Sequence, residues 1–397
     1  MEPNLLIIVI FIILVSCLQL LNRRLLQQII HPNLSNRITT ILVIIHMPLI
    51  AHAGIRTLGI GKNIGWLIFL AQIGILFQLF TVMMLLTCGI SNIIWQWINR
   101  RQDTDSGILA NTRQKIFLQK ASIVGAILAV CCTIHGVIKA RSEPNITHCE
   151  LKFAGLPPGL DGLRIVQISD LHAGPMVKLK QVERWRYLIE REKPELLLIT
   201  GDIVNSLPKE ARIVADAFRN FHAPLGCFAI LGNHDYFTDP NPIWDTLSCA
   251  GIKFLENSSF LISRKGDELA IIGLQDSAAS HKNLLSGKTY GNGPRPDIAT
   301  QGIPKNIWRI CINHRPSDWY LAKRTGALLT LSGHTHGGQV NFIPGISSAL
   351  LLGKQYTQGL YKEGPHYLYV NRGLGVVALP IRIGAQPEIT VITLHKG

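Results

Sequence analysis

The stretch "LRIVQISDLH", residues 163–172, joins a short apolar run to two polar side chains that can bind a metal ion. The run has the length and apolarity of a buried strand, and Asp170 and His172 follow it directly. In α/β sheets, ligands bind at the carboxyl ends of the strands, because the loops there converge on a crevice. The stretch therefore predicts a strand that carries a ligand-binding loop at its end.

The same arrangement recurs four more times along the chain. Metal-capable or acidic side chains follow the runs "ELLLIT", "CFAIL", "WRICIN" and "ALLTLS", and these residues are Asp202, Asn233, His234, Asp235, His314, His334 and His336. Polar, helix-like segments such as "LKQVERWRYLIERE" separate the runs, as in an α/β domain. One such ending can arise by chance, but five in a row indicate a shared site.

The residue types suit divalent metal ions. Asp, Asn and His supply oxygen and imidazole ligands for Mn, Fe, Zn or similar ions, and no thiolate is included. In a strand, residues i and i+2 share a face, so His334 and His336 are expected to face one crevice. The candidates are too many for one ion and fit two ions that share a carboxylate: Asp170, His172, Asp202, Asn233, His314, His334 and His336.

These motifs, in this order, resemble those of the calcineurin-like metallophosphoesterase family over about residues 160–396. The segment "GHTHGGQ" and the closing segments "YTQGLY", "LYVNRGLG" and "PIRIGAQPEITVITL" are similar to its membrane-anchored bacterial branch. The resemblance implies an α/β fold, a sandwich of two mixed β-sheets flanked by helices. It also implies a ligand assignment, with Asp202 bridging two ions, one held by Asp170, His172 and His336 and the other by Asn233, His314 and His334.

The resemblance further implies a reaction, in which a metal-bridging hydroxide attacks phosphorus without a phosphoenzyme intermediate. His234, oriented by Asp235, would protonate the leaving oxygen or stabilise the transition state. The segment "NHRPSD" departs from the commoner family pattern and places Arg315 beside the site. Arg315 could bind a second phosphate group, or it could be a surface arginine paired with Asp318. Asp276 is expected in a solvated loop.

The first part of the chain has a different composition. Four stretches read as membrane spans by length and apolarity: 4–21, 38–55, 64–90 and 121–140. We therefore expect a membrane domain at 1–145 and a metallophosphoesterase domain at 146–397. Residues 1–145 carry a net charge of +8 out of +14, but the basic residues lie in loops between apolar segments, without a basic stripe or an RNA-binding motif. Nucleic acid is not an expected partner.

Basic residues in the loops predict the orientation, because Lys and Arg accumulate on the cytoplasmic side. Eight lie in the first and third loops, against four on the other side. This count predicts a multi-pass protein of the bacterial cytoplasmic membrane, with its catalytic domain on the non-cytoplasmic side.

The membrane tether favours a lipid-linked phosphomonoester, diester or pyrophosphate as substrate. The apolar segment "ISSALLLG", residues 346–353, could face acyl chains or form a core strand. One similar branch hydrolyses UDP-2,3-diacylglucosamine in lipid A synthesis, but that substrate is made in the cytosol, against the predicted orientation. A catalytically inactive membrane sensor or scaffold is a further alternative, which the complete ligand set opposes. The sequence leaves the metal identities and the oligomeric state open.

Overall fold

The computed structural model describes residues 131–397, apart from 284–285, 342–345, 352 and 378, and eight isolated positions between 90 and 128. The chain divides into two compact units, Met1–Gly136 and Val137–Gly397.

The expected spans fall largely outside the described residues, which include nothing of 4–21 or 38–55, one residue of 64–90 and part of 121–140. Residues 131–140 are helical. Among the described residues, no helix has both the length and the apolarity needed to cross a membrane.

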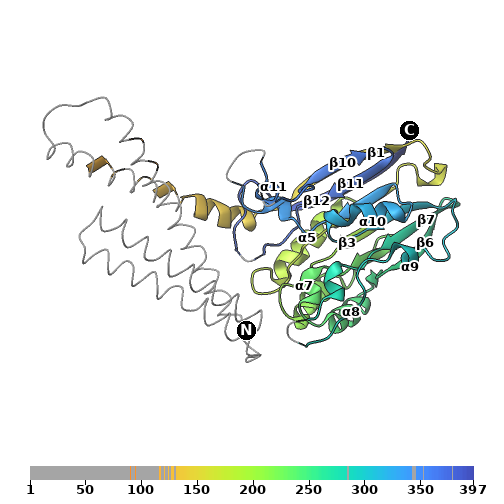
Figure 1. The fold of residues 1–397 in the computed structure, drawn as a ribbon, viewed down its shortest axis with the longest axis horizontal. Coiled ribbons are helices and arrows are strands. Elements are labelled where there is room, and N and C mark those ends of the chain that lie inside the picture. The colour runs from red at the N-terminus through yellow and green to blue at the C-terminus, as the bar shows by residue number, and fades with distance from the viewer. Residues whose placement is uncertain are drawn as a thin grey trace. The chain divides into compact units, whose positions relative to one another are not determined.

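Two six-stranded sheets form the centre of the second unit (Figure 1). The first sheet contains, in spatial order, β1 (Asn145–Phe153), β12 (Glu388–Lys396), β2 (Arg164–Ile168), β3 (Leu196–Thr200), β4 (Cys227–Ile230) and β5 (Lys253–Phe254). The second contains β10 (Gly359–Glu363), β11 (His366–Val370), β9 (Leu329–Ser332), β8 (Trp308–Ile312), β7 (Asp267–Gly273) and β6 (Ser258–Arg264).

Both sheets are mixed, as the resemblance to the family implies. Strands β2 to β5 run parallel, whereas β12 is antiparallel to β2 and parallel to β1. In the second sheet, β11, β9, β8 and β7 run parallel, and the outer strands β10 and β6 are antiparallel to their neighbours. The parallel strands place the ends of β2, β3 and β4 at one edge, and those of β8 and β9 likewise.

The central strands are apolar throughout because both of their faces are buried. In β3, Leu196 and Leu198 join the core between the two sheets, while Leu197 and Ile199 join the core under the helices. In β8, Ile310 also faces the core between the sheets. This two-residue alternation between two cores explains why the runs show no polar alternation in the sequence.

Helices and short 3-10 turns connect the strands of the two sheets. The helices are α5 (Leu179–Arg191), α6 (Ala211–Phe218), α7 (Asn233–Tyr236), α8 (Pro240–Ser248), α9 (Pro296–Ala299), α10 (Trp319–Arg324) and α11 (Ser348–Leu351). The 3-10 turns are η1 (Pro158–Leu160), η2 (Pro208–Glu210), η3 (Ser277–Ser280), η4 (Pro316–Asp318) and η5 (His336–Gly338). Helix α5 buries Val182, Trp185 and Ile189, the spacing of one apolar stripe on a helix that packs against a sheet.

Candidate metal centre

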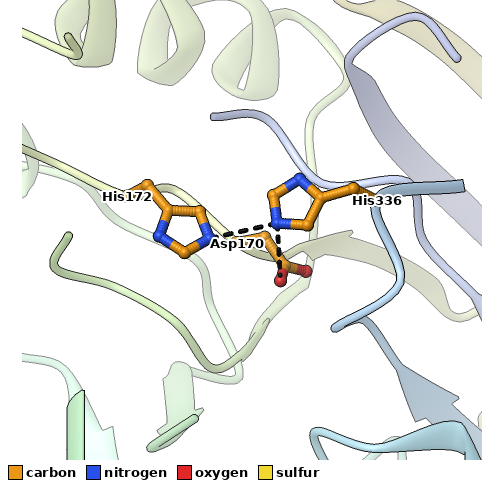
Figure 2. A group of neighbouring side chains, drawn as sticks. All are labelled: Asp170, His172 and His336. Carbon is orange, nitrogen blue, oxygen red and sulfur yellow. Dashed lines mark hydrogen bonds and ion pairs between the residues drawn. The ribbon is translucent and has the colours of Figure 1, made fainter. Parts of the chain in front are cut away.

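The seven predicted ligands come together where the strands end. Asp170 and His172 follow β2, and His336 begins η5 after β9 (Figure 2). Nε2 of His336 lies 3.0 Å from Nε2 of His172 and 3.4 Å from Oδ1 of Asp170. The ligand atoms of this group, here called the first cluster, all lie within 4.8 Å of one another.

A second cluster is formed by Asp202, His314 and His334, whose ligand atoms also lie within 4.8 Å of one another. Nε2 of His314 lies 3.2 Å from Nδ1 of His334 and 3.2 Å from Oδ1 of Asn233. The side-chain oxygen of Asn233 therefore adjoins the second cluster.

Asp202, a member of the second cluster, also lies close to the first. Its Oδ2 is 3.3 Å from Nε2 of His314 and 3.7 Å from Nε2 of His172. One carboxylate oxygen is thus close to a histidine of each cluster, which is the position expected of a ligand shared by two ions.

The chemistry of the clusters fits divalent cations. Burial, together with neighbouring positive groups, lowers the pKa of His172 to about 3, so its ring is neutral. Burial also lowers the pKa of His336, so two neutral rings face each other through nitrogens that lie 3.0 Å apart. Burial raises the pKa of Asp170 to about 6, with a contribution from the charge of Asp202. Neutral imidazoles packed against buried carboxylates form a donor set that a cation would satisfy.

The pKa of His314 is shifted in the opposite direction, upwards. Burial opposes its charge, but the nearby carboxylates of Asp202 and Asp170 outweigh burial and raise the pKa of His314 to about 10. Its Nδ1 lies 2.8 Å from the carbonyl oxygen of Thr200, which fixes the ring and leaves Nε2 facing the cluster. A bound cation would take the place of the proton at Nε2.

The loops that carry the ligands turn sharply. Five of the ligand residues have a left-handed backbone that non-glycine residues rarely adopt: Asp170 (φ 51°), His172 (46°), Asp202 (52°), His334 (71°) and His336 (52°). Glycines allow the close approaches nearby. A Cβ at Gly232 would lie 2.3 Å from Oδ1 of Asp202, and one at Gly333 would lie 2.4 Å from Oδ2 of Asp170.

These turns correct the expectation that His334 and His336 share the face of a strand. Strand β9 ends at Ser332, so neither histidine is extended. Both reach the site, one in each cluster, because successive left-handed turns redirect the chain rather than because strand positions alternate.

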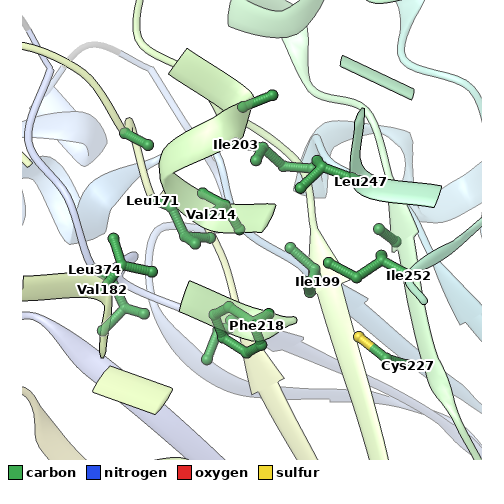
Figure 3. Close-up of a cluster of buried hydrophobic side chains, with 14 of the residues drawn as sticks. Leu171, Val182, Ile199, Ile203, Val214, Phe218, Cys227, Leu247, Ile252 and Leu374 are labelled. Atoms are coloured by element: carbon green, nitrogen blue, oxygen red, sulfur yellow. The ribbon is translucent and has the colours of Figure 1, made fainter. Parts of the chain in front are cut away.

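Apolar neighbours anchor the ligand loops in the core. Leu171, between Asp170 and His172, is fully buried, and so is Ile203, which follows Asp202. Figure 3 shows Leu171 close to Val214, within the cluster that packs under the helices. Each loop thus inserts one apolar side chain into the core while its polar neighbours face the metal centre, and this limits how far the ligands can move.

The role expected of Asp235 is wrong in its detail. The carboxylate of Asp235 accepts hydrogen bonds from the backbone N–H groups of Ile203, Val204 and Gly232, so it holds two loops together. The ring of His234 is oriented by a different group, the carbonyl oxygen of Asn205, which lies 2.9 Å from Nδ1. These backbone N–H groups supply the hydrogen bonds that the buried carboxylate of Asp235 needs. No sequence pattern signals such a contact between a side chain and the backbone of another loop.

Arg315 lies beside the second cluster, and its partner is Asp276 rather than Asp318. Nε of Arg315 donates to both oxygens of Asp276, at 2.8 and 3.1 Å, and Nη1 lies 3.4 Å from Nε2 of His334. Asp276 is 2% exposed, so the expectation of a solvated loop is also wrong. The fully buried carboxylate of Asp276 fixes Arg315, whose side chain remains 23% exposed.

Comparisons with known proteins agree with this geometry. The calcineurin-like phosphoesterase family matches residues 163–338. A Bacillus subtilis protein named "Uncharacterized metallophosphoesterase YkuE" is 32% identical over 64% of this chain and 87% of its own length. A Danio rerio "Transmembrane protein with metallophosphoesterase domain" is 30% identical over 78% of this chain and 69% of its own length.

An Escherichia coli protein named "Phosphodiesterase YaeI" is 29% identical over 58% of this chain and 82% of its own length. The matched family begins at the strand that precedes Asp170 and ends just after His336. It therefore spans both clusters and every loop that supplies them. The chain belongs to the calcineurin-like metallophosphoesterase family and is a metal-dependent phosphoester hydrolase.

Proposed function

We propose that this protein is a membrane-anchored phosphoesterase that uses two divalent metal ions to hydrolyse a phosphate ester or pyrophosphate of a lipid-linked substrate. One observation carries the two-ion part of the proposal: Oδ2 of Asp202 lies within 3.7 Å of a histidine nitrogen from each cluster. A single-ion site would need neither the second cluster nor a shared carboxylate.

The ligand assignment follows the clusters. Asp170, His172 and His336 would hold one ion, His314, His334 and Asn233 the other, and Asp202 both. Two bound ions would supply Lewis acidity, which lowers the pKa of water and neutralises phosphate charge. The protein holds these ligands on loops fixed by buried leucine and isoleucine side chains, so the site is preorganised.

His234 would handle the proton of the leaving group. A ring nitrogen of His234 lies within 4.8 Å of ligand atoms of His172 and Asp202. Because Nδ1 faces the carbonyl oxygen of Asn205, that nitrogen keeps its proton, and the ring can gain or lose a second proton only at Nε2. The imidazolium would donate from Nε2 to the departing oxygen.

Arg315 would bind the phosphate or a second phosphate group of the substrate. Its Nε is taken up by Asp276, while Nη1 faces the second cluster. A guanidinium fixed at one edge keeps its orientation and loses little conformational freedom when the other edge binds an oxyanion.

A lipid-linked substrate is supported by apolar side chains near the clusters. Phe237, 46% exposed, packs its ring 5.3 Å from that of His234. Ile346 and Leu350 are also exposed. The segment that carries them is bonded to η5, since the hydroxyl of Ser348 donates to the carbonyl oxygen of Gly338. Exposed apolar residues on segments that contact His234 and η5 suit an acyl or prenyl chain.

Membrane anchoring has two further supports. The apolar stretches of residues 1–145 have the length of membrane spans, and the Danio rerio relative is named as a transmembrane protein. The count of basic residues in the loops favours a catalytic unit on the non-cytoplasmic side.

Activity with Mn²⁺ tests the proposed function. The full chain, purified in detergent, is expected to release phosphate or a phosphorylated head group from lipid phosphates faster than it cleaves soluble nucleotides. Equal rates on both substrate classes would contradict the lipid-linked substrate. Loss of a phosphorylated lipid from cells that gain the gene would identify the natural substrate.

A UDP-2,3-diacylglucosamine pyrophosphatase-like activity is the second candidate, because the same clusters suit a pyrophosphate and Arg315 could bind its second phosphate. It requires a cytosolic active site. A topology reporter fused after Gly397 decides between the candidates: an external reporter excludes the pyrophosphatase, and a cytosolic one excludes the proposed orientation.

A further inference from the structure

A buried arginine lies behind the first cluster. Arg382, in the segment "PIRIGAQPEI", is 0% exposed and is the largest fully buried side chain among the described residues. Its guanidinium donates to four backbone carbonyl oxygens rather than to a carboxylate: those of Arg372, Gly373, Gly375 and Ala385. A buried charge is costly unless it is paired or hydrogen-bonded, and these carbonyl oxygens supply the acceptors that the guanidinium needs.

Two of these carbonyls belong to the loop that supports Asp170. The N–H of Leu374 donates to the carbonyl oxygen of Ser169 at 3.0 Å, and that of Gly375 donates to the carbonyl oxygen of Asp170 at 2.8 Å. Gly373 packs so closely that a Cβ there would lie 2.7 Å from Cβ of Asp170. Arg382 therefore fixes the backbone against which the first ligand rests.

The same guanidinium reaches a second ligand directly. Nη2 of Arg382 lies 3.2 Å from Nδ1 of His336, on the side of the ring opposite to Nε2. Nε2 of His336 faces His172 and Asp170. Arg382 thus lies against the ring of one ligand and behind the loop of another, and both ligands belong to the first cluster. The loop carries the inference, because arginine can only donate, while a neutral ring that binds a cation through Nε2 keeps its proton on Nδ1.

The second cluster has its own supports. The carbonyl oxygen of Thr200 fixes His314, and Arg315 contacts His334. Each cluster is therefore backed by a different arginine, one buried and one partly accessible.

We propose that Arg382 is a positioning residue that selectively sets the metal affinity of the first cluster. The inference rests on the proposed two-ion site and goes beyond it, because it makes the two ions separable. Partners of metal ligands commonly change metal affinity by about 10- to 100-fold when they are removed. Arg382→Met is therefore expected to weaken one of two Mn²⁺ ions at least about tenfold and to leave the other unchanged.

Arg264 provides a matched control. It is also buried, and it donates to the carbonyl oxygens of Gly159 and Asp161 and to the carboxylate of Glu195. Glu195 precedes β3, whereas Asp202 follows it, so Arg264 lies at the opposite end of the strand from the metal centre. Arg264→Met removes a buried arginine of the same kind without touching a ligand.

Calorimetric titration of the metal-free full chain with Mn²⁺ is the experiment. His336→Ala and His334→Ala identify which step belongs to each cluster. Arg382→Met is expected to change the step that His336→Ala abolishes, and Arg264→Met to lower the thermal midpoint with both steps intact. The proposal is overturned if Arg382→Met binds both ions as the wild type does, or weakens both steps equally.

Two further outcomes remain decisive. If Arg382→Met does not fold, Arg382→Lys, which keeps the charge but not the planar fork, is titrated instead and is held to the same result. If the wild-type chain binds only one ion, the two-ion function fails, while Arg382 is still tested: a weaker ion in the variant supports its role, and an unchanged ion overturns it.

Discussion

Asp202 is the residue on which the proposed chemistry depends most, because one of its carboxylate oxygens lies close to a histidine of each cluster. Asp202→Ala is expected to lower turnover by more than about a hundredfold and to reduce the bound metal at the same time. Metal analysis beside a phosphatase assay measures both effects. Asp267→Ala, on β7, controls for the loss of an acidic side chain. Full activity in Asp202→Ala would rule out the proposed centre.

The left-handed backbone of His334 gives a prediction about stability. With φ at 71°, the residue has a conformation in which a side chain costs about 1–2 kcal/mol and glycine does not. Without metal, His334→Gly is expected to be more stable than His334→Ala by about 1 kcal/mol. Thermal unfolding of the two variants measures the difference. The order should reverse at Ala215 in helix α6, where Ala215→Gly is destabilising.

Glu256 gives a prediction about pH. Burial raises the pKa of its carboxyl group to about 8, although the hydroxyl of Tyr236 and the N–H of Leu231 donate to it. The pKa of Glu256 is higher in the folded state than in the unfolded state, whose value is 4.5. The contribution of Glu256 to folding stability is therefore complete below the unfolded pKa and is lost as pH rises towards 8.

Glu256→Gln removes this decline, since an amide does not ionise. At pH 8.5 the free energy of unfolding of the variant is expected to exceed that of the wild type by at least about 1 kcal/mol, because one pKa unit is worth about 1.4 kcal/mol. Thermal melts from pH 5 to pH 9 measure the gap. The exposed Glu268→Gln should follow the wild type throughout, and an equal pH slope in Glu256→Gln would contradict the assignment.

At the scale of elements, the five ligand-bearing strands could be predicted because each is an apolar run buried on both faces and ends in a polar side chain. The path after β9 could not, because the turn depends on backbone angles at His334 and His336 that no periodicity reports. Arg382 carries no local signal either, since its partners are carbonyl oxygens of other loops.

The segment that leads into helix α11 gives a prediction about substrates. Ile346 is 38% exposed and Leu350 is 52% exposed, so changing both to serine removes apolar surface without opening the core. The double variant is expected to lose about tenfold in kcat/KM on a lipid phosphate, because burying the two side chains against the lipid is worth at least about 1.4 kcal/mol. It is expected to retain its kcat/KM on a soluble ester. Parallel kinetics on both substrates measure this, and equal losses would contradict contact with a lipid.

For the whole molecule, the metal ions are expected to stabilise the fold, because the clusters unite loops from both sheets. Ligand binding to the folded state alone adds about 2.7 kcal/mol at a hundredfold excess over Kd. Chelation should therefore lower the thermal midpoint of the wild type by several degrees. The midpoint of Asp202→Ala should respond less, and equal responses would show that the chelated metal lies elsewhere.

The place of β12 has a consequence for biosynthesis. Strand β1 is the first of the described strands to leave the ribosome, yet Asn145 pairs with Glu388 of the last one, which also separates β1 from β2. The first sheet therefore cannot be completed during translation, and β1 has no partner strand in it until the whole catalytic unit has been translated. An insertion in the exposed turn between β10 and β11, residues 364–365, would lengthen that delay and lies outside the loops that carry the metal ligands.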